Sequence, residues 1–223
     1  MDNLQKMYEG HHAGHRDQGF SILKEARGPR FSNLIGKGKR VLDIGCRDGA
    51  LTSFFVADNM VTGADIDSVA LARARKNIGI ETVELDLYSD WSALSGRAFD
   101  VVVAGEVLEH LFFPEKILGR ICDHLEHGGS FVGSVPNAFS MKNRLRLLFA
   151  KKDHTPLHDP THVNHFAAKE LRELLSRYFF DVEIFGLGKH AFLAKTFPNL
   201  LAFDLIFMAK GPRDRKGEDQ RLT

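Results

Sequence analysis

Residues 41–52 read VLDIGCRDGALT, and this stretch decides the fold that the sequence predicts. Its first residues are mostly apolar, which indicates a buried strand. Glycines follow at 45 and 49, and glycine tolerates the positive φ of a tight turn and lets a backbone approach a ligand closely. We expect residues 49–57 to form a helix, whose first N–H groups carry partial positive charge and favour a carboxylate.

The same alternation of strand and helix continues along the chain. Strands are expected at 39–46, 60–66, 81–87, 99–105 and 130–136. Helices are expected at 67–77, capped by Asp67 or Ser68, and at 114–129, 140–152 and 167–179. A closing pair of strands is expected at 181–188 and 205–210. Such alternation predicts an α/β protein with a mostly parallel sheet covered on both faces.

The domain organisation follows from where this pattern begins and ends. Residues 1–38 are interpreted as an N-terminal cap segment, and 39–210 as one domain. Within that domain, residues 138–166 interrupt the alternation and are expected to form a lid insertion. Residues 211–223 are charged and almost free of apolar side chains, which predicts a disordered tail.

Composition narrows the possible partners and compartment. The net charge of +1 gives no global signal for nucleic acid. The two cysteines, Cys46 and Cys122, are too few for a disulfide framework and fit a reducing, cytoplasmic setting. The polar N-terminus does not resemble a signal peptide, and no apolar run approaches the roughly 20 residues that span a bilayer.

Acidic residues end three of the expected strands. Asp43 would repel a pyrophosphate but suits the ammonium or sulfonium of S-adenosylmethionine, and the dinucleotide fingerprint G-x-G-x-x-G fails here. Asp65 lies 20 residues after Gly45, where a carboxylate can accept hydrogen bonds from both ribose hydroxyls. Asp86 could accept from the adenine amino group while the N–H of Leu87 donates to the ring.

The segments VLDIGCRDG, VTGADID, VELDL and FDVVVAGEVLEHL, in this order, resemble the class I S-adenosylmethionine-dependent methyltransferases. The resemblance implies a three-layer, Rossmann-like fold with a mostly parallel seven-stranded sheet and one antiparallel strand. It implies S-adenosylmethionine as cofactor. The cofactor residues assigned here are Asp43, Gly45, Cys46, Gly49, Asp65, Ile66, Asp86, Leu87 and Glu106. Arg47 replaces the family's middle glycine, and we expect its side chain to fold away from the ligand.

Three segments are similar to a subgroup of this family. GEVLEHL at 105–111, with SVPN and PTHVNHF further on, resembles the quinone-type and cell-surface sugar O-methyltransferases. Three interpretations of Glu106, Glu109 and His110 remain open. Glu106 touches the cofactor while the other two hold the loop, or His110 is a general base, or all three bind a divalent cation. We prefer the first and assign no metal site, and we keep His110 as a candidate catalytic residue.

The segment 154–166 holds four histidines and is expected to face the acceptor. His162 is proposed as base or acceptor contact, against the alternatives of a lid-pinning histidine or a metal site. Residues 140–152 combine basic side chains with Met141, Leu145 and Leu148 at helical spacing. They could rest on an anionic membrane or hold a phosphorylated acceptor, and we prefer a lid helix with a solvated basic face.

Together these features predict methyl transfer from S-adenosylmethionine to an oxygen of a small-molecule acceptor. A sugar or lipid-linked glycan hydroxyl is placed ahead of a quinone-type phenol. Two other classes stay as alternatives, a non-catalytic partner protein with the cofactor fold and a nicotinamide oxidoreductase. A nucleic-acid acceptor is disfavoured because the chain shows no strong basic surface.

Overall fold

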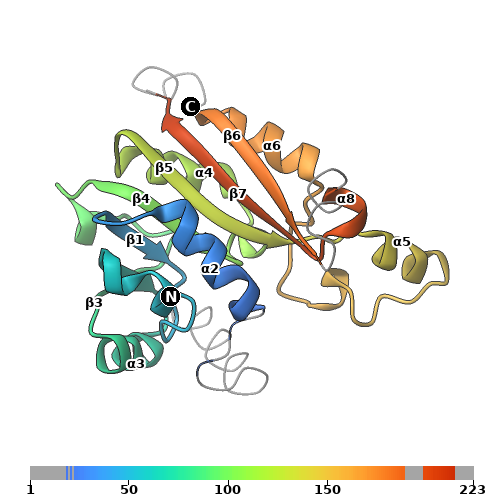
Figure 1. The fold of residues 1–223 in the computed structure, drawn as a ribbon, viewed down its shortest axis with the longest axis horizontal. Helices are drawn as coiled ribbons and strands as arrows, with labels where there is room; N and C mark the ends of the chain where they lie inside the picture. Colours follow the sequence, from blue (N-terminus) through green and yellow to red (C-terminus); the bar gives the residue numbers. More distant parts are fainter. Residues whose placement is uncertain (1–18, 20, 22, 189–197, 214–223) are drawn as a thin grey trace.

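A seven-stranded sheet forms the centre of the computed structural model, which describes residues 19, 21, 23–188 and 198–213 (Figure 1). Its strands are β1 (Arg40–Ile44), β2 (Met60–Asp65), β3 (Glu81–Glu84), β4 (Phe99–Gly105), β5 (Leu125–Pro136), β6 (Phe179–Leu187) and β7 (Asp204–Pro212). Their order is β3-β2-β1-β4-β5-β7-β6, and β7 runs antiparallel to both of its neighbours. The predicted mostly parallel sheet with one antiparallel strand is therefore confirmed.

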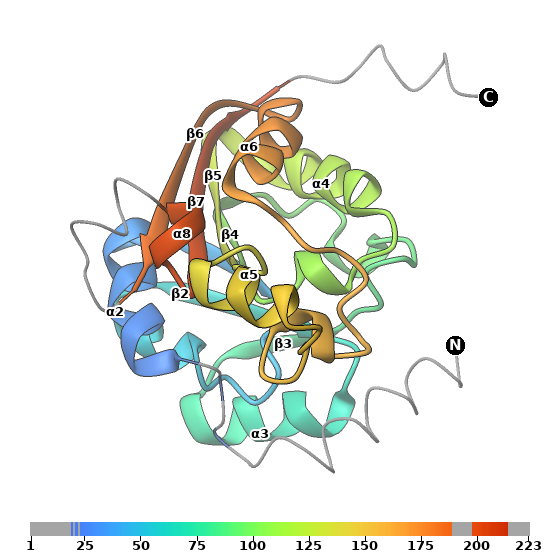
Figure 2. The ribbon, with the colours of Figure 1, turned by 90° about the vertical axis from the view of Figure 1, so that its right-hand side faces the viewer.

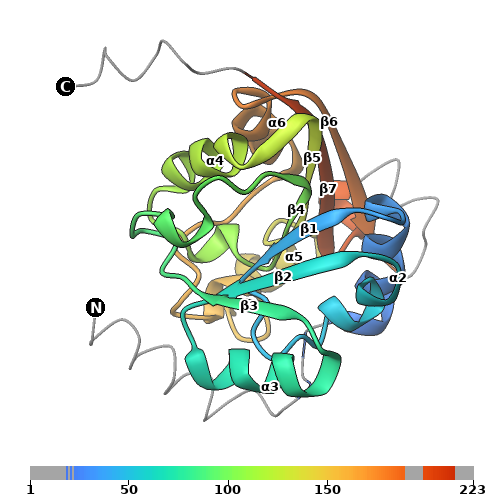
Figure 3. The same cartoon turned by 90° about the vertical axis from the view of Figure 1, so that its left-hand side faces the viewer.

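Helices cover both faces of this sheet, which gives three layers (Figure 3). The helices are α2 (Lys24–Ile35), α3 (Ser68–Ile78), α4 (Pro114–Asp123), α5 (Met141–Leu148), α6 (Ala168–Ser176) and the short α8 (Pro198–Leu201). Apolar residues of α2 and α3 join one buried cluster, and those of α4 and α6 join the other. The Asp67 side chain caps α3 by accepting from the backbone N–H of Ala70, as the sequence predicted.

The side chains of the central strands point alternately to the two faces of the sheet, and both faces are apolar. In β4, Val101 and Val103 point to the α2 side, while Val102 and Ala104 point to the α4 and α6 side. Successive side chains of a strand face opposite ways, so a strand covered on both faces needs a continuous apolar run. The uninterrupted apolar run of residues 101–104 indicates such a strand, and all four side chains are buried.

The expected helix at 49–57 is wrong. The segment forms two 3₁₀ turns instead, at Thr52–Phe54 and Val56–Asp58. Threonine, phenylalanine and valine are weaker helix formers than alanine or leucine. The Asn59 side chain also donates to the carbonyls of Phe55 and Gly36, at 2.9 and 3.1 Å, and so ends the segment. The described segment that follows the turn after β1 is therefore not a long helix whose dipole points at that turn.

Several boundaries also differ from expectation. Helix α4 ends at Asp123 rather than at the glycines 128 and 129, because Leu125 already pairs with β4. Strand β7 extends through Pro212, which pairs with Phe179, so ordered structure continues two residues into the expected tail. Helix α2 occupies part of the expected cap segment. Residues 1–18 and 214–223 lie outside the described part.

The carboxyl ends of β1, β2, β4 and β5 lie at one edge of the sheet, where α5 and the segment 149–166, both parts of the expected lid 138–166, also lie (Figure 2). In open parallel sheets ligands bind at this edge, because the loops that follow the strands converge there. Within the described residues, no helix has the length and apolar content that a bilayer crossing requires.

Candidate active site

The turn after β1 has a backbone that only glycine fits at two positions. Gly45 and Gly49 have φ values of 71° and 81°. A Cβ added at Gly45 would lie 2.7 Å from Cγ2 of Val107, and one at Gly49 would lie 2.4 Å from Cδ1 of Ile78. Both positions therefore combine a left-handed backbone with close packing, which explains why this turn carries glycine.

A pocket opens beside this turn. It is lined by Ser21, Arg27, Asp43, Gly45, Cys46, Arg47, Asp48, Ala50, Leu51, Gly105 and Glu106. The structure thus brings together four of the predicted cofactor residues, Asp43, Gly45, Cys46 and Glu106. Arg47 was expected to turn away from the ligand, yet it is one of the lining residues, with a φ of 49°.

Asp43 supplies a buried carboxyl group to this pocket. It is 3% exposed and accepts a hydrogen bond of 2.6 Å from the Thr52 hydroxyl. Burial raises the pKa of Asp43 to about 7, the Thr52 hydrogen bond opposes this, and the neighbouring charge of Asp65 adds to it. A cation bound in the pocket would favour the ionised form, so the site suits an ammonium or sulfonium group.

Arg27 faces the same pocket from α2 and was missed by the sequence analysis. Its side chain is 1% exposed, donates to the Ser134 hydroxyl at 2.9 Å and forms an ion pair of 3.2 Å with Glu106. Its Nε has no hydrogen-bond partner among the described residues. A buried guanidinium is well suited to a carboxylate such as that of methionine. Nothing in the sequence distinguishes Arg27 from the exposed Arg30 three residues later.

Three carboxyl groups lie around Arg27. Glu106 accepts from Ser134 at 3.0 Å, and Asp204 at the start of β7 lies 3.9 Å from Nε of Arg27. Burial, and then the charge of Glu106, raise the pKa of both Glu109 and Asp204 well above the usual carboxyl range. Burial therefore favours the protonated forms of Glu109 and Asp204, and Glu106 is the carboxyl group that lies nearest to Arg27.

Asp65 orders the turn from the end of β2. Its carboxylate accepts from the backbone N–H groups of Arg47 and Asp67, at 2.8 and 2.9 Å, and the side chain is 6% exposed. These bonds hold the β1 turn against the start of α3. The predicted ribose contact would use the remaining lone pairs of the same carboxylate and stays a prediction. Ile66, the next predicted residue, is half-buried.

The remaining predicted cofactor residues sit in local turns or in the core. Asp86 accepts from the N–H of Tyr88 at 2.9 Å, and the carbonyl of Leu87 accepts from Trp91 and Arg120. The Cys46 thiol is buried, and burial together with the charge of Asp43 raises its pKa well above the usual value. Cys46 can therefore contribute packing but not a thiolate.

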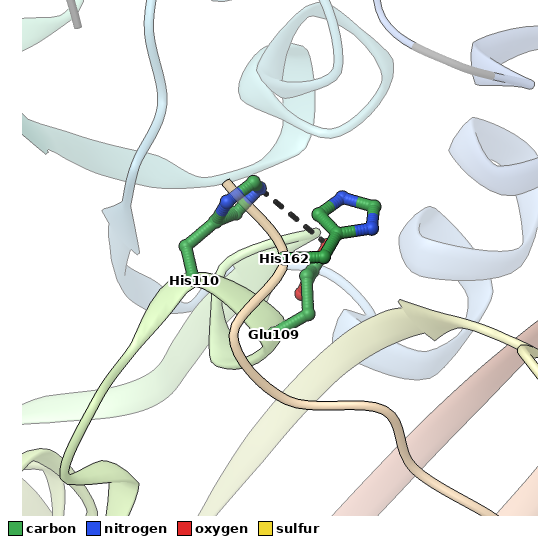
Figure 4. Close-up of side chains that lie close together, drawn as sticks. All are labelled: Glu109, His110 and His162. Atoms are coloured by element: carbon green, nitrogen blue, oxygen red, sulfur yellow. Dashed lines mark ion pairs between the residues drawn. The ribbon is translucent and has the colours of Figure 1, made fainter. Parts of the chain in front are cut away.

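Two histidines meet next to this pocket, one on the loop after β4 and one on the lid (Figure 4). Nδ1 of His110 lies 3.0 Å from the carbonyl of Thr161, and Nδ1 of His162 lies 3.0 Å from the carbonyl of Pro156. A carbonyl oxygen only accepts, so each Nδ1 donates, and Nε2 is the nitrogen that offers a lone pair in the neutral ring. The ring centroids are 4.8 Å apart, so these two predicted catalytic residues do come together.

Glu109 completes this group. Both of its carboxyl oxygens are buried without a hydrogen-bond partner among the described residues, and Oε1 lies 3.8 Å from Nε2 of His110. One ligand atom each from Glu109, His110 and His162 lies within 4.8 Å of the others. The backbone carbonyl of Glu109 accepts from the N–H groups of Val163 and Asn164, both at 2.9 Å, which fixes the lid to this loop.

This grouping differs from both metal interpretations of the sequence. Glu106 contacts Arg27 and Ser134 rather than joining Glu109 and His110, and its backbone has a φ of 60°. In the lid, His154 and His158 are exposed, and burial lowers the pKa of His165. Among the described residues, the grouping with metal-ligand spacing is Glu109, His110 and His162.

The sheet order, the antiparallel β7 and the glycine turn after β1 together define the class I methyltransferase fold. The chain belongs to the methyltransferase domain family, whose model matches residues 16–183. This confirms the family predicted from the sequence.

Two curated relatives show how far the similarity extends. The chain is 31% identical over 148 residues to a probable S-adenosylmethionine-dependent methyltransferase of Mycolicibacterium smegmatis, covering 66% of this chain and 53% of that protein. It is 33% identical over 105 residues to a ubiquinone biosynthesis O-methyltransferase of Aromatoleum aromaticum, covering 45% of each. The chain thus spans about half the length of these curated relatives.

Solved structures share the fold at lower identity. A SAM-dependent methyltransferase from Archaeoglobus fulgidus has a TM-score of 0.66 at 20% identity, covering 91% of this chain and 99% of that one. The N-methyltransferase NodS from Bradyrhizobium japonicum, in complex with S-adenosyl-L-homocysteine, has a TM-score of 0.61 at 18% identity, covering 89% and 94%. At these identities the likeness establishes the fold alone.

Proposed function

We propose that this protein transfers the methyl group of S-adenosylmethionine to an oxygen atom of a small-molecule acceptor. The observation that carries the proposal is the pair of imidazoles, His110 and His162, beside the loop that holds the pocket residue Glu106. The pocket itself presents a guanidinium from Arg27 and a carboxyl from Asp43. These charges are opposite to those of the carboxylate and the ammonium at the methionine end of the cofactor.

The chemistry requires little covalent help from the protein. Attack by the acceptor oxygen forms an O–CH₃ bond while the S–CH₃ bond breaks, leaving a neutral thioether. Holding the two reactants in line can supply roughly 7–11 kcal/mol of the barrier. A base that takes the hydroxyl proton adds about 10²–10⁴-fold, and Nε2 of His162 or His110 carries the lone pair for that step.

The acceptor that we propose is a sugar or lipid-linked glycan hydroxyl, with a quinone-type phenol as the alternative. The phenol is supported by several relatives, ubiquinone biosynthesis O-methyltransferases that are 32–38% identical over 101–106 residues. A phenol has a pKa near 10, so it ionises more readily than a sugar hydroxyl. A sugar acceptor would therefore depend more strongly on the histidine base.

Glu109, His110 and His162 have the spacing of ligands to a divalent cation, which gives a second candidate mechanism. Glu109 offers buried oxygens without hydrogen-bond partners, and each histidine has its Nδ1 fixed by a carbonyl, as metal-ligating histidines do. A bound cation would lower the pKa of an acceptor hydroxyl. The absence of a metal requirement, expected from the sequence, stays a prediction.

The test is methyl transfer from isotope-labelled S-adenosylmethionine to a panel of sugar, glycan and catechol acceptors, followed by mass spectrometry. Treatment with a chelator, then readdition of Mg²⁺ or Zn²⁺, separates the two mechanisms. Activity that survives chelation assigns the histidine base, whereas loss and metal-dependent recovery assign the cation. Absence of any binding of S-adenosylmethionine by calorimetry would favour the non-catalytic partner protein and overturn the proposal.

Two further expectations belong to this proposal. A cytoplasmic location is supported by the two cysteines, Cys46 and Cys122, which are both buried and are not joined by a disulfide. No nucleic-acid partner is expected, since the net charge is only +1.

A further inference from the structure

Helix α5 presents its apolar side to the outside of the molecule. Met141, Leu145, Leu148 and the following Phe149 are 44%, 51%, 76% and 71% exposed. At 100° per residue these four positions fall within about 100° of arc, so they form one stripe. The helix residue buried on the opposite side is the polar Asn143. A surface helix of a globular protein normally has the reverse arrangement.

Hydrogen bonds hold α5 in this orientation, with its apolar stripe outward. The side-chain amide of Asn143 donates to the carbonyl of Asn137 at 2.9 Å, directly after β5. The Ser140 hydroxyl caps the helix by accepting from the N–H of Asn143. Arg144 donates from Nε to the carbonyl of Phe139 at 2.8 Å. The inward side of α5 is therefore fixed by hydrogen bonds at the edge of the site, and the apolar stripe is left outside.

Positive charges border the stripe. Lys142 and Arg144 lie on its two sides by helical angle, and Lys151 and Lys152 follow the helix, all of them exposed. The sequence contains no aspartate or glutamate between Glu126 and Asp153. Scattered exposed apolar side chains are ordinary, but a contiguous stripe rimmed by cations has the composition of an interfacial helix.

We propose that the surface formed by α5 and residues 149–152 binds a membrane that contains anionic lipid. Leu145, Leu148 and Phe149 enter the boundary between headgroups and acyl chains, and the bordering lysines contact lipid phosphates. Each cation near such a surface contributes through the negative surface potential. An anionic membrane accounts for both the apolar stripe and the cations that border it, whereas an apolar protein groove would leave those cations without partners.

This surface continues directly into the lid. Figure 2 shows α5 in front of the sheet, with the segment 149–166 continuing from its end. That segment carries His162, which meets His110. The patch would therefore place the site close to the membrane, which suits a lipid-linked or otherwise apolar acceptor. The suggestion about the acceptor rests on the proposed methyl transfer, whereas the proposed binding to lipid is independent of it.

Co-sedimentation of the full chain with vesicles tests the proposal. The vesicles are equal parts phosphatidylglycerol and phosphatidylcholine, compared with phosphatidylcholine alone. We expect binding to the anionic vesicles that weakens with salt. The double variant Leu148→Ser, Phe149→Ser should bind at least about tenfold more weakly, because two large apolar side chains no longer enter the lipid. Met60→Ser is the matched control, since Met60 is 68% exposed at the amino end of β2.

Three results would overturn the proposal. They are a wild-type chain that stays in the supernatant with anionic vesicles, a double variant that binds like wild type, and equal binding to neutral vesicles. Gel filtration adds a further check, because a dimer that the double variant disrupts would assign the stripe to a second copy. Calorimetric titration with S-adenosylhomocysteine measures binding at the cofactor site of the same protein. Vesicle binding without cofactor binding would refute the proposed function and leave this inference standing.

Discussion

Replacing Asp43 with asparagine tests two effects of this carboxyl group separately: its contribution to cofactor affinity and its effect on the free energy of unfolding. Asparagine has nearly the same size and keeps an oxygen that can accept from the Thr52 hydroxyl, which lies 2.6 Å from Asp43 in the wild-type chain. It removes the ionisation whose pKa burial raises to about 7. We expect Asp43→Asn to make the cofactor-free protein more stable at alkaline pH and to weaken binding of the cationic cofactor.

The magnitude follows from linkage between protonation and folding. The folded pKa of Asp43 is raised from 3.8 to about 7, so its contribution to stability is fully present below pH 3.8 and is lost as the pH rises through 7. Each pKa unit corresponds to about 1.4 kcal/mol, so the wild-type chain should lose roughly 3 kcal/mol at this residue between pH 5 and pH 8. The asparagine variant lacks that loss.

Urea denaturation of both proteins at pH 5 and pH 8, without cofactor, measures the effect. Glu109 and Asp204 also have raised pKa values, but they titrate in both proteins and cancel in the comparison. Calorimetric titration with S-adenosylmethionine at pH 8 gives the second readout, where the variant should bind at least about tenfold more weakly.

Two results would refute this reasoning. If the stability difference between the two proteins is the same at pH 5 and pH 8, Asp43 does not titrate in this range in the folded state. If the variant binds S-adenosylmethionine as tightly as wild type does, Asp43 does not face the positive end of the ligand.

Two further predictions concern the other site residues. Asp65→Ala should weaken cofactor binding about tenfold or more, and should also lower the free energy of unfolding by roughly 1–3 kcal/mol, because the N–H groups of Arg47 and Asp67 lose their acceptor. Unchanged affinity in calorimetry would remove Asp65 from the ribose site. His162→Ala should lower kcat by about 10²-fold or more and leave cofactor affinity nearly intact, whereas the exposed lid residue His154→Ala should change neither. Equal turnover of the His162 variant and wild type would give His162 a structural role.

The sequence was sufficient where local pattern and packing agree. The run of apolar residues in 99–105 predicted a strand covered on both faces, and the glycines at 45 and 49 predicted a tight turn. It failed at 49–57, where apolar content suggested a helix but threonine, phenylalanine and the bonds from Asn59 favoured short 3₁₀ turns. Helical spacing therefore did not establish helical structure in so short a segment.

The sequence by itself determined the sheet, the turn and the family, because these depend on periodicity and on backbone conformations that few residues can adopt. Only the tertiary structure decided which charged groups meet. Arg27 and Glu106 are 79 residues apart in the chain, and His110 and His162 are 52 apart, yet each pair is in contact. It also decided that α5 turns its apolar side outward, because the hydrogen bonds of Asn143 set that rotation. Contacts between distant segments depend on how the layers pack, and no local pattern encodes that packing.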